Sequence, residues 1–252
     1  VAVVHDAYTG VAARPVWGPM YGDAAINETQ LSRQLFERMP SGSIVIGDRA
    51  FGVFSVANEV VLNGHDVVMR LKDDRARRIS GKLPMSRAEE EVEWSASYRE
   101  LLHYPELTGN ERIQGRIITR KLKVKKENGE PEYLRIFTTL MDVSADEIVA
   151  LYSQRWNVET DIRDLKQTLK LNYLRSKTVD MVLKELHLAV IAYNIVNELR
   201  RQIALKSGDR PRDLSFTRVM REAHNDGQRI VLGHELTLRQ IMFREAVASN
   251  TA

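Results

Sequence analysis

The length, composition and charge of this chain exclude several classes of protein. Its 252 residues, 43% of them hydrophobic, can bury a substantial core, and the absence of cysteine excludes disulfides, thiolate metal sites and thiol catalysis. With 37 basic and 34 acidic residues the net charge is only +3, so a nucleic-acid surface would require local clustering of charge; no signal peptide or apolar run of transmembrane length is present, and we expect a soluble, unexported protein.

The first 72 residues predict strands and helices in alternation. A continuously apolar run from Ser43 ends in Asp48, which is the pattern of a buried strand that delivers a carboxylate to the edge of a sheet. The other expected elements are a hairpin that starts the chain inside a sheet (1–17), a helix capped by Asn27 (27–39), a helix closed by Gly64 (53–63) and a strand (65–71).

Residues 73–143 differ in character and predict a β-rich insertion. Residues 89–111 carry seven acidic side chains and one basic, whereas residues 112–126 carry seven basic side chains and no acidic one. In the basic segment Lys121, Lys123 and Lys125 alternate with apolar residues, so a strand would present a cationic face. Asn128-Gly129 is typical of a hairpin turn, and residues 133–140 would form the return strand.

A capping box at Ser144 opens a predicted helix that runs to about Leu171. Tyr152, Arg155, Glu159 and Lys166 fall within about 60° of one another on this helix, beside its apolar face. Asp161 and Asp164 fall on the other side. A second long helix is expected over residues 179–205, with Ile195 among its packing residues, followed by shorter helical pieces after Gly208.

The mixture of groups on this stripe indicates phosphodiester chemistry. A carboxylate can hold a divalent metal, while Arg and Lys bind phosphate. Asp48 and Glu159 are therefore candidate ligands, and we expect them to converge in the fold. A two-metal site needs more oxygen ligands than two carboxylates supply, so a third carboxylate is expected.

The pattern Tyr152-x2-Arg155-x3-Glu159-x6-Lys166 resembles the YREK signature of bacterial DDE transposases of the insertion-sequence-four group. The run IVIGDRAF around Asp48 resembles the segment that carries their second Asp. The resemblance extends from Val1 to about Leu205. It implies a ribonuclease-H-like α/β fold with a mixed sheet and flanking helices, a β-rich insertion and a helical C-terminal segment.

The resemblance divides the chain into four parts: 1–72 and 144–206 as two parts of the catalytic core, 73–143 as the insertion, and 207–252 as a C-terminal helical tail. The family fold carries its first catalytic Asp on a strand that has no counterpart here. Asp6 lies at a turn, so we expect that first Asp to precede Val1 and this segment by itself to be inactive.

The same resemblance implies the function of DNA transposition. Mg2+ or Mn2+ would be held by Asp48 and Glu159, and Tyr152, Arg155 and Lys166 would contact DNA phosphates near the cleaved end. Further DNA contacts are expected from the basic strand, at Arg120, Lys121, Lys123 and Lys125. The implied partners are transposon-end and target DNA and a second copy of the protein when DNA is bound, with no membrane, in the bacterial cytoplasm at the nucleoid.

Less specific interpretations compete with these assignments. Glu159 could pair with Arg155 or Arg163 on a surface helix, and Asp48 could be a turn former beside Arg49. Trp94 could stack on a flipped base or fill a core, Trp156 is expected to pack, and the basic strand could be a solvated edge. The whole chain could also be a non-catalytic DNA-binding remnant, or a scaffold with no nucleic-acid role.

Overall fold

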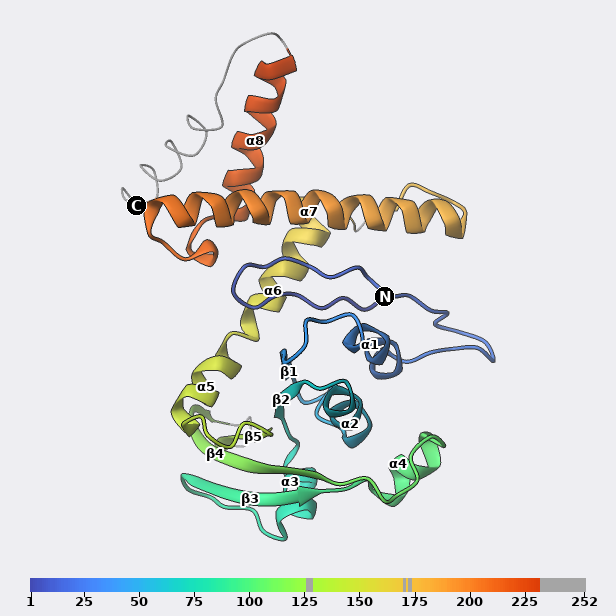
Figure 1. Cartoon of the computed structure of the whole chain (residues 1–252), viewed down its shortest axis with the longest axis vertical. Coiled ribbons are helices and arrows are strands. Elements are labelled where there is room, and N and C mark those ends of the chain that lie inside the picture. Colours follow the sequence, from blue (N-terminus) through green and yellow to red (C-terminus); the bar gives the residue numbers. More distant parts are fainter. Residues whose placement is uncertain (126–128, 170, 172–173, 232–252) are drawn as a thin grey trace. The chain divides into compact units, whose positions relative to one another are not determined.

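The computed structural model describes residues 1–125, 129–169, 171 and 174–231 of the chain (Figure 1). Asn128 and Lys126 of the predicted basic hairpin, and the end of the C-terminal tail, lie outside these residues. The chain divides into two compact units. One comprises Val1–Ala2 and Val16–Arg155, and the other comprises Val3–Pro15 and Trp156–Ala252.

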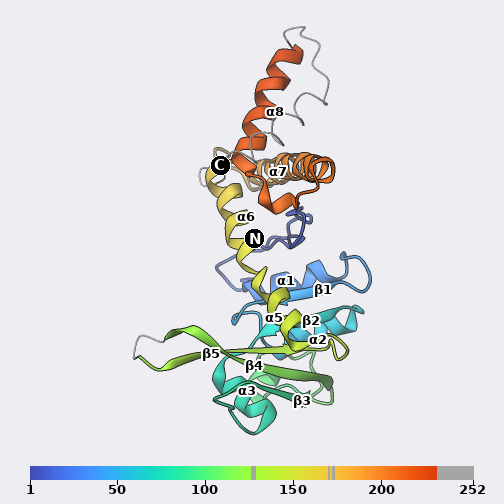
Figure 2. The ribbon, with the colours of Figure 1, turned by 90° about the vertical axis from the view of Figure 1, so that its left-hand side faces the viewer.

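The first unit is built around a mixed five-stranded sheet. Its strands are β1 (Ile44–Gly47), β2 (Asp66–Arg70), β3 (Ala88–Trp94), β4 (Ile113–Lys125) and β5 (Pro131–Thr138). They lie in the order β1-β2-β5-β4-β3, with β1 parallel to β2 and the remaining pairs antiparallel (Figures 1 and 2). This arrangement confirms the predicted α/β class and the strands expected at 43–48 and 65–71. However, β1 is an edge strand rather than a buried one, and Ile44 is 41% exposed.

Helices of the first unit cover both faces of this sheet. They are α1 (Glu28–Phe36), α2 (Phe54–Leu62), α3 (Asp73–Ser80), α4 (Tyr98–His103) and α5 (Ala145–Ser153). Asn27 caps α1 and Ser144 caps α5, each through the predicted local hydrogen bonds. Both helix starts are therefore confirmed.

Two apolar cores form because successive side chains of a strand point to opposite faces. Val67 and Met69 of β2 join the core that contains α1 and α2, whereas Val68 joins the core beneath α5. Trp94 is fully buried in the first of these cores, with its ring centroid 4.8 Å from that of Phe137. The core interpretation of Trp94 is thereby confirmed.

The strands of residues 73–143 continue the same sheet that contains β1 and β2. The boundaries of a separate insertion stay a prediction. The charge segregation seen in the sequence becomes cross-strand pairing between β3 and β4: Glu89 lies 3.1 Å from Arg120 and 3.5 Å from Arg116, and Glu93 lies 3.5 Å from Arg112. The acids missing from the basic segment itself are thus supplied by its neighbouring strand.

The second unit is helical and has its own apolar core. Its elements are α6 (Trp156–Arg163), the π-helix η1 (Asp164–Thr168), α7 (Val179–Ser207), the 3-10 turn η2 (Pro211–Asp213) and α8 (Phe216–Val231). Val190, Tyr193 and Val196 of α7 pack there with residues of η1 and α8. The long helix is confirmed, but Ile195, which was expected to pack, is 58% exposed.

The prediction of one helix from Ser144 to Leu171 is wrong. The helix breaks at Gln154 and Arg155, whose backbone N–H groups bond to carbonyls three residues earlier. Ile148 packs on the sheet in the first unit and Asp161 is buried in the second. On a continuous helix these positions would lie about 140° apart, so packing overrides the sequence period. The four-residue stripe is therefore not one helical face.

The prediction that the chain begins inside a sheet is also wrong. Val1–Trp17 turns back on itself as expected, but it forms only isolated antiparallel bridges, Ala2 with Val16 and His5 with Ala12. Instead of a neighbouring strand, the side-chain amide of Asn194 on α7 both donates to and accepts from the backbone of Ala12, each at 2.8 Å. A helix side chain thus satisfies backbone groups that a sheet would otherwise pair.

None of the helices in the described part of the chain has the combination of length and apolarity required to cross a lipid bilayer.

Candidate functional site

Asp48 follows β1 directly and begins a tight loop. Its Oδ1 atom accepts hydrogen bonds from the backbone N–H groups of Ala50, at 2.8 Å, and Phe51, at 3.3 Å. Within the residues that the structure describes, Oδ2 accepts no hydrogen bond. Asp48 is thus a turn former, as the less specific interpretation holds, and one of its two oxygens remains available to a ligand.

The loop after Asp48 lies unusually close to β2. A side chain at Gly52 would place its Cβ 2.2 Å from the backbone oxygen of Arg70, so only glycine fits here. Arg75 of α3 donates a hydrogen bond to the Gly52 carbonyl oxygen. These contacts hold the Asp48 loop from two separate elements.

Glu100 of α4 fixes the far end of this loop. Its Oε1 atom accepts a hydrogen bond of 2.7 Å from the backbone N–H of Phe54, the first residue of α2. Its Oε2 atom accepts hydrogen bonds from the N–H and hydroxyl of Ser97. Burial acts to raise the pKa of Glu100, but these hydrogen bonds and the charge of Arg78 outweigh burial and lower the pKa below its usual value.

Tyr152 lies near the end of α5 and is 7% exposed, packed in the core beneath that helix. Burial raises the pKa of its hydroxyl, Arg70 and Arg155 lower it, and Asp48 raises it further. All three charged groups therefore act on the Tyr152 hydroxyl. Tyr152 also shares its core with Ile46 of β1 and Val68 of β2, the strands that lead to Asp48 and Arg70. Three of the predicted site residues, Asp48, Tyr152 and Arg155, therefore lie in one region of the first unit.

Arg70 was not predicted as a site residue. It ends β2, pairs with Glu132 at 2.6 Å and acts on the Tyr152 hydroxyl. Arg49, which was considered as a partner of Asp48, instead lies 3.6 Å from the same Glu132. No sequence motif marks Arg70, but its position at the end of a strand beside β1 was a usable signal.

Glu159 and Lys166 belong to the second unit. Glu159 lies in the first turn of α6, where the helix dipole favours a carboxylate, and its side chain is exposed. Lys166 lies in η1 and is also exposed. Trp156, expected to pack, is 64% exposed at the start of α6, so that expectation is wrong.

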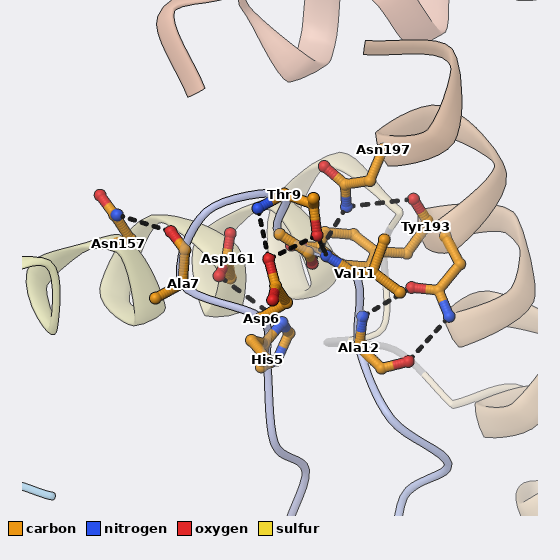
Figure 3. Close-up of polar contacts among 12 residues, drawn as sticks. His5, Asp6, Ala7, Thr9, Val11, Ala12, Asn157, Asp161, Tyr193 and Asn197 are labelled. Atoms are coloured by element: carbon orange, nitrogen blue, oxygen red, sulfur yellow. Dashed lines mark hydrogen bonds and ion pairs between the residues drawn. The ribbon is translucent and has the colours of Figure 1, made fainter. Parts of the chain in front are cut away.

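Asp161 was not predicted as a site residue, yet it is fully buried in the second unit, at 0% exposure. Arg212 of η2 binds both of its oxygens. His5 lies 3.5 Å from it (Figure 3), and burial lowers the pKa of His5 although Asp161 acts in the opposite direction. The ion pair with Arg212 explains why a charged side chain is tolerated at this buried position.

Asp6 forms a turn rather than a ligand cluster. Its Oδ1 atom accepts hydrogen bonds from the backbone N–H groups of Tyr8 and Thr9 and from the hydroxyl of Thr9; Figure 3 shows Thr9 bound to Asp6. The adjoining Ala7 carbonyl accepts a hydrogen bond from Asn157 on α6. Glu159, two residues further on, projects about 200° away from Asn157 around that helix, so it faces away from the Asp6 turn.

The basic strand divides into paired and exposed cations. Arg120 is 12% exposed and bound to Glu89 and Asp146, which competes with its predicted DNA contact. Lys121 and Lys123 are exposed, while Leu122 between them packs into the core beneath α5. The predicted alternation is therefore confirmed at these three positions. Lys125 ends β4, opposite Pro131.

Among the described residues, no group of three or more His, Asp or Glu side chains is placed to hold a metal ion. The two predicted metal ligands lie one in each unit, Asp48 in the first and Glu159 in the second, and their role stays a prediction.

Comparison with known proteins bears on these residues. Residues 20–195 match the family described as "Transposase DDE domain". The chain is 25% identical over 200 residues to "Transposase InsG for insertion sequence element IS4" of Escherichia coli (strain K12), covering 78% of this chain and 44% of that protein. It is 34% identical over 85 residues to "Probable transposase for insertion sequence element IS5377" of Geobacillus stearothermophilus, covering 34% of this chain and 22% of that protein.

The chain therefore spans less than half the length of these curated relatives. The family match covers more than half of the chain and includes Asp48, the Tyr152 to Lys166 segment and the whole sheet. This protein belongs to the DDE transposase family, in the insertion-sequence-four group that its YREK pattern resembles.

Proposed function

We propose that the intact protein is a DNA transposase that cuts and rejoins the ends of its element, with this chain as its catalytic domain. The observation that carries the proposal is that Asp48 and Arg70 lie at the ends of the paired strands β1 and β2, beside the end of α5, which carries Tyr152 and is followed by Arg155. This arrangement combines an oxygen ligand with cations at the end of a strand. Family membership supports the same reaction.

Asp48 and Glu159 are the proposed metal ligands. Asp48 fits a hard cation because its loop fixes the carboxylate while Oδ2 accepts no hydrogen bond from described residues. Glu159 fits because it is an exposed carboxylate at a helix start. Mg2+ or Mn2+ bound by them would activate the attacking oxygen and stabilise charge on the phosphate. A third carboxylate completes the set in this proposal.

The proposed phosphate contacts are cationic or hydroxyl groups. Tyr152, Arg155 and Lys166 would bind phosphates near the cleaved end, and Arg70 joins them because it acts on the Tyr152 hydroxyl. Lys121 and Lys123, with Lys125 at the end of β4, would contact the DNA backbone further away; Arg120 would have to exchange its ion pairs for phosphate. The proposed partners are transposon-end and target DNA and a second protomer.

A non-catalytic DNA-binding role is the second candidate. It is favoured by the exposed Lys121 and Lys123 of β4, which need no metal to contact a DNA backbone. The basic surfaces alone would suffice for this role.

Incubating the intact protein with DNA that carries both ends of its element separates the two candidates. A transposase yields nicked and joined strands with Mg2+ and none with a chelator, whereas a binding remnant shifts the DNA without cutting it under either condition.

A further inference from the structure

The rotation of α6 about its own axis decides where Glu159 points. This helix has only eight residues, begins after the turn at Gln154 and Arg155, and passes into the π-helix η1. α6 and η1 thus form one short helical piece, separated from α5 by the break at Gln154 and Arg155. Because α5 does not continue into this piece, tertiary contacts set the rotation of α6 about its axis.

The ion pair of Asp161 and Arg212 is strong enough to set the rotation of α6. Asp161 is fully buried, and the two terminal nitrogens of Arg212 each bind one of its oxygens, the Nη2 to Oδ2 contact being 2.9 Å. A two-point contact between planar groups fixes orientation as well as distance. Leaving the buried Asp161 carboxylate without a partner would strongly destabilise the folded protein. Water molecules therefore do not readily replace Arg212 as its partner.

Arg212 also holds the turn of the N-terminal hairpin. It donates hydrogen bonds to the carbonyl oxygens of Ala7, at 3.2 Å, and Asp6, at 3.0 Å. Figure 3 shows the same turn bound to α6 through Asn157 and to α7 through Asn197. One guanidinium thus ties η2, α6 and the hairpin turn together within the second unit.

The direction of Glu159 follows from helix geometry. Two residues along an α-helix correspond to about 200° of rotation, so Glu159 lies on the side of α6 opposite Asp161. Fixing Asp161 inward therefore fixes Glu159 outward. The exposed side chain of Glu159 agrees with this arrangement.

We propose that Arg212 is a positioning residue that orients the metal ligand Glu159 by clamping Asp161 on the opposite side of α6. The role of Glu159 as a metal ligand rests on the proposed function. The clamp, which is the contact of Arg212 with Asp161, does not. Arg212 lies beyond residues 20–195, which match the family domain, so in this proposal a segment outside that domain orients a metal ligand.

Two variants of the intact protein separate orientation from stability. Arg212→Lys keeps the charge but loses the two-point contact. The double variant Asp161→Leu with Arg212→Met replaces the buried ion pair by apolar groups, an exchange that commonly preserves folding. Arg210→Met is the matched control, because Arg210 pairs with Asp213 at 3.0 Å in the same turn but is solvent-exposed.

Two readouts are needed. Amide hydrogen exchange without metal should become faster by about tenfold in residues 156–163 of both test variants, because loss of the clamp lets α6 open locally. The Mg2+ concentration for half-maximal cleavage of end DNA should rise by about tenfold, as for other residues that orient a metal ligand. Both test variants should bind end DNA as tightly as the wild type. The control Arg210→Met should match the wild type in hydrogen exchange and in Mg2+ requirement.

The outcomes are distinct. Unchanged exchange in residues 156–163 overturns the clamp. Faster exchange with an unchanged Mg2+ requirement shows a merely structural pair and overturns the positioning role. If the wild type binds end DNA but never cleaves it, the proposed function fails; exchange confined to α6 then still supports the clamp, and exchange that rises throughout the protein overturns it.

Discussion

The carboxylate of Asp48 is held by residues that lie far from it in the sequence. Gly52 permits the close approach to β2, Arg75 binds the Gly52 carbonyl and Glu100 caps α2 just beyond the loop. Glu100 makes these contacts as an anion in a largely buried position. The free energy of unfolding should therefore depend on whether Glu100 is ionised.

Replacing Glu100 by Gln should lower the free energy of unfolding by about 1.5–3 kcal/mol at pH 7, because hydrogen bonds to a charged acceptor are lost. The folded-state pKa of Glu100 is lowered, so its contribution is fully present above the usual pKa of 4.5 and is lost as the pH falls through the folded-state value. Urea unfolding of both proteins between pH 7 and pH 3 should show the difference shrinking below pH 4.5.

Glu91→Gln is the control for Glu100→Gln, since Glu91 is an exposed carboxylate on β3 and should change stability by less than about 0.5 kcal/mol. A stability difference for Glu100→Gln that does not depend on pH would show that the carboxylate is not ionised in these hydrogen bonds.

Removing only the hydroxyl of Tyr152 tests the phosphate role assigned to it. Tyr152→Phe keeps the packing beneath α5, so end-DNA affinity should fall by about 10–100-fold, as expected for the loss of one charged hydrogen bond. Tyr98→Phe, on exposed α4, should leave the affinity unchanged. Equal affinities of the two variants in fluorescence anisotropy would remove Tyr152 from the DNA contacts.

At this scale the sequence predicted residues whose roles are local. Asn27 and Ser144 cap helices through neighbours three residues away, and Asp48 follows a strand. Asp161 is buried because it pairs with Arg212, and Arg70 is held by Glu132. These partners lie more than 50 residues away in the sequence, so no local pattern predicts them. Sequence spacing therefore predicted the local caps and turns, but not the ion pairs formed between residues far apart in the chain.

At the scale of elements, the helix predicted from Ser144 is two segments with different cores. Tyr152 and Arg155 fall in the first unit, whereas Glu159 and Lys166 fall in the second. The YREK spacing therefore does not describe one helical face. Helix periodicity failed here because both Ile148 and Asp161 had to be buried, and a break at Gln154 allowed this.

The β4 strand shows a similar distinction between sequence and structure. Arg116 and Arg120 of β4 pair with Glu89 of β3 and Asp146 of α5, while Lys121 and Lys123 stay exposed. The register of β3 against β4 decides which cations are paired, and register cannot be read from one strand alone. The lysines are thus better candidates for DNA contact than Arg120.

Replacing Lys121 and Lys123 by Ala should weaken DNA binding equally for any sequence. The slope of log affinity against log salt should become less steep by about 2, since each lysine releases about one counterion. Lys72→Ala with Lys184→Ala removes the same charge at exposed positions outside β4. If both double variants reduce the slope equally, only net charge matters and the strand is not a DNA surface.

At the scale of the whole molecule, the predicted α/β class and the helical C-terminal part are both present. The sequence could not show that the hairpin of residues 3–15 belongs with the helical unit, because its partners are Asn194, Asn197 and Arg212. Family membership is established over residues 20–195, and the segments on either side supply the Asp161 clamp.

The most direct test of the proposed metal ligands measures Mg2+-dependent cleavage and binding of end DNA by the intact protein and its Asp48→Asn and Glu159→Gln variants. Glu37→Gln, at an exposed helix end, serves as the control. Both test variants should lose at least about 1000-fold in cleavage, because a metal ligand is removed, while binding stays within about threefold. Cleavage by either test variant at the rate of the control would contradict the assignment of Asp48 and Glu159 as the metal ligands.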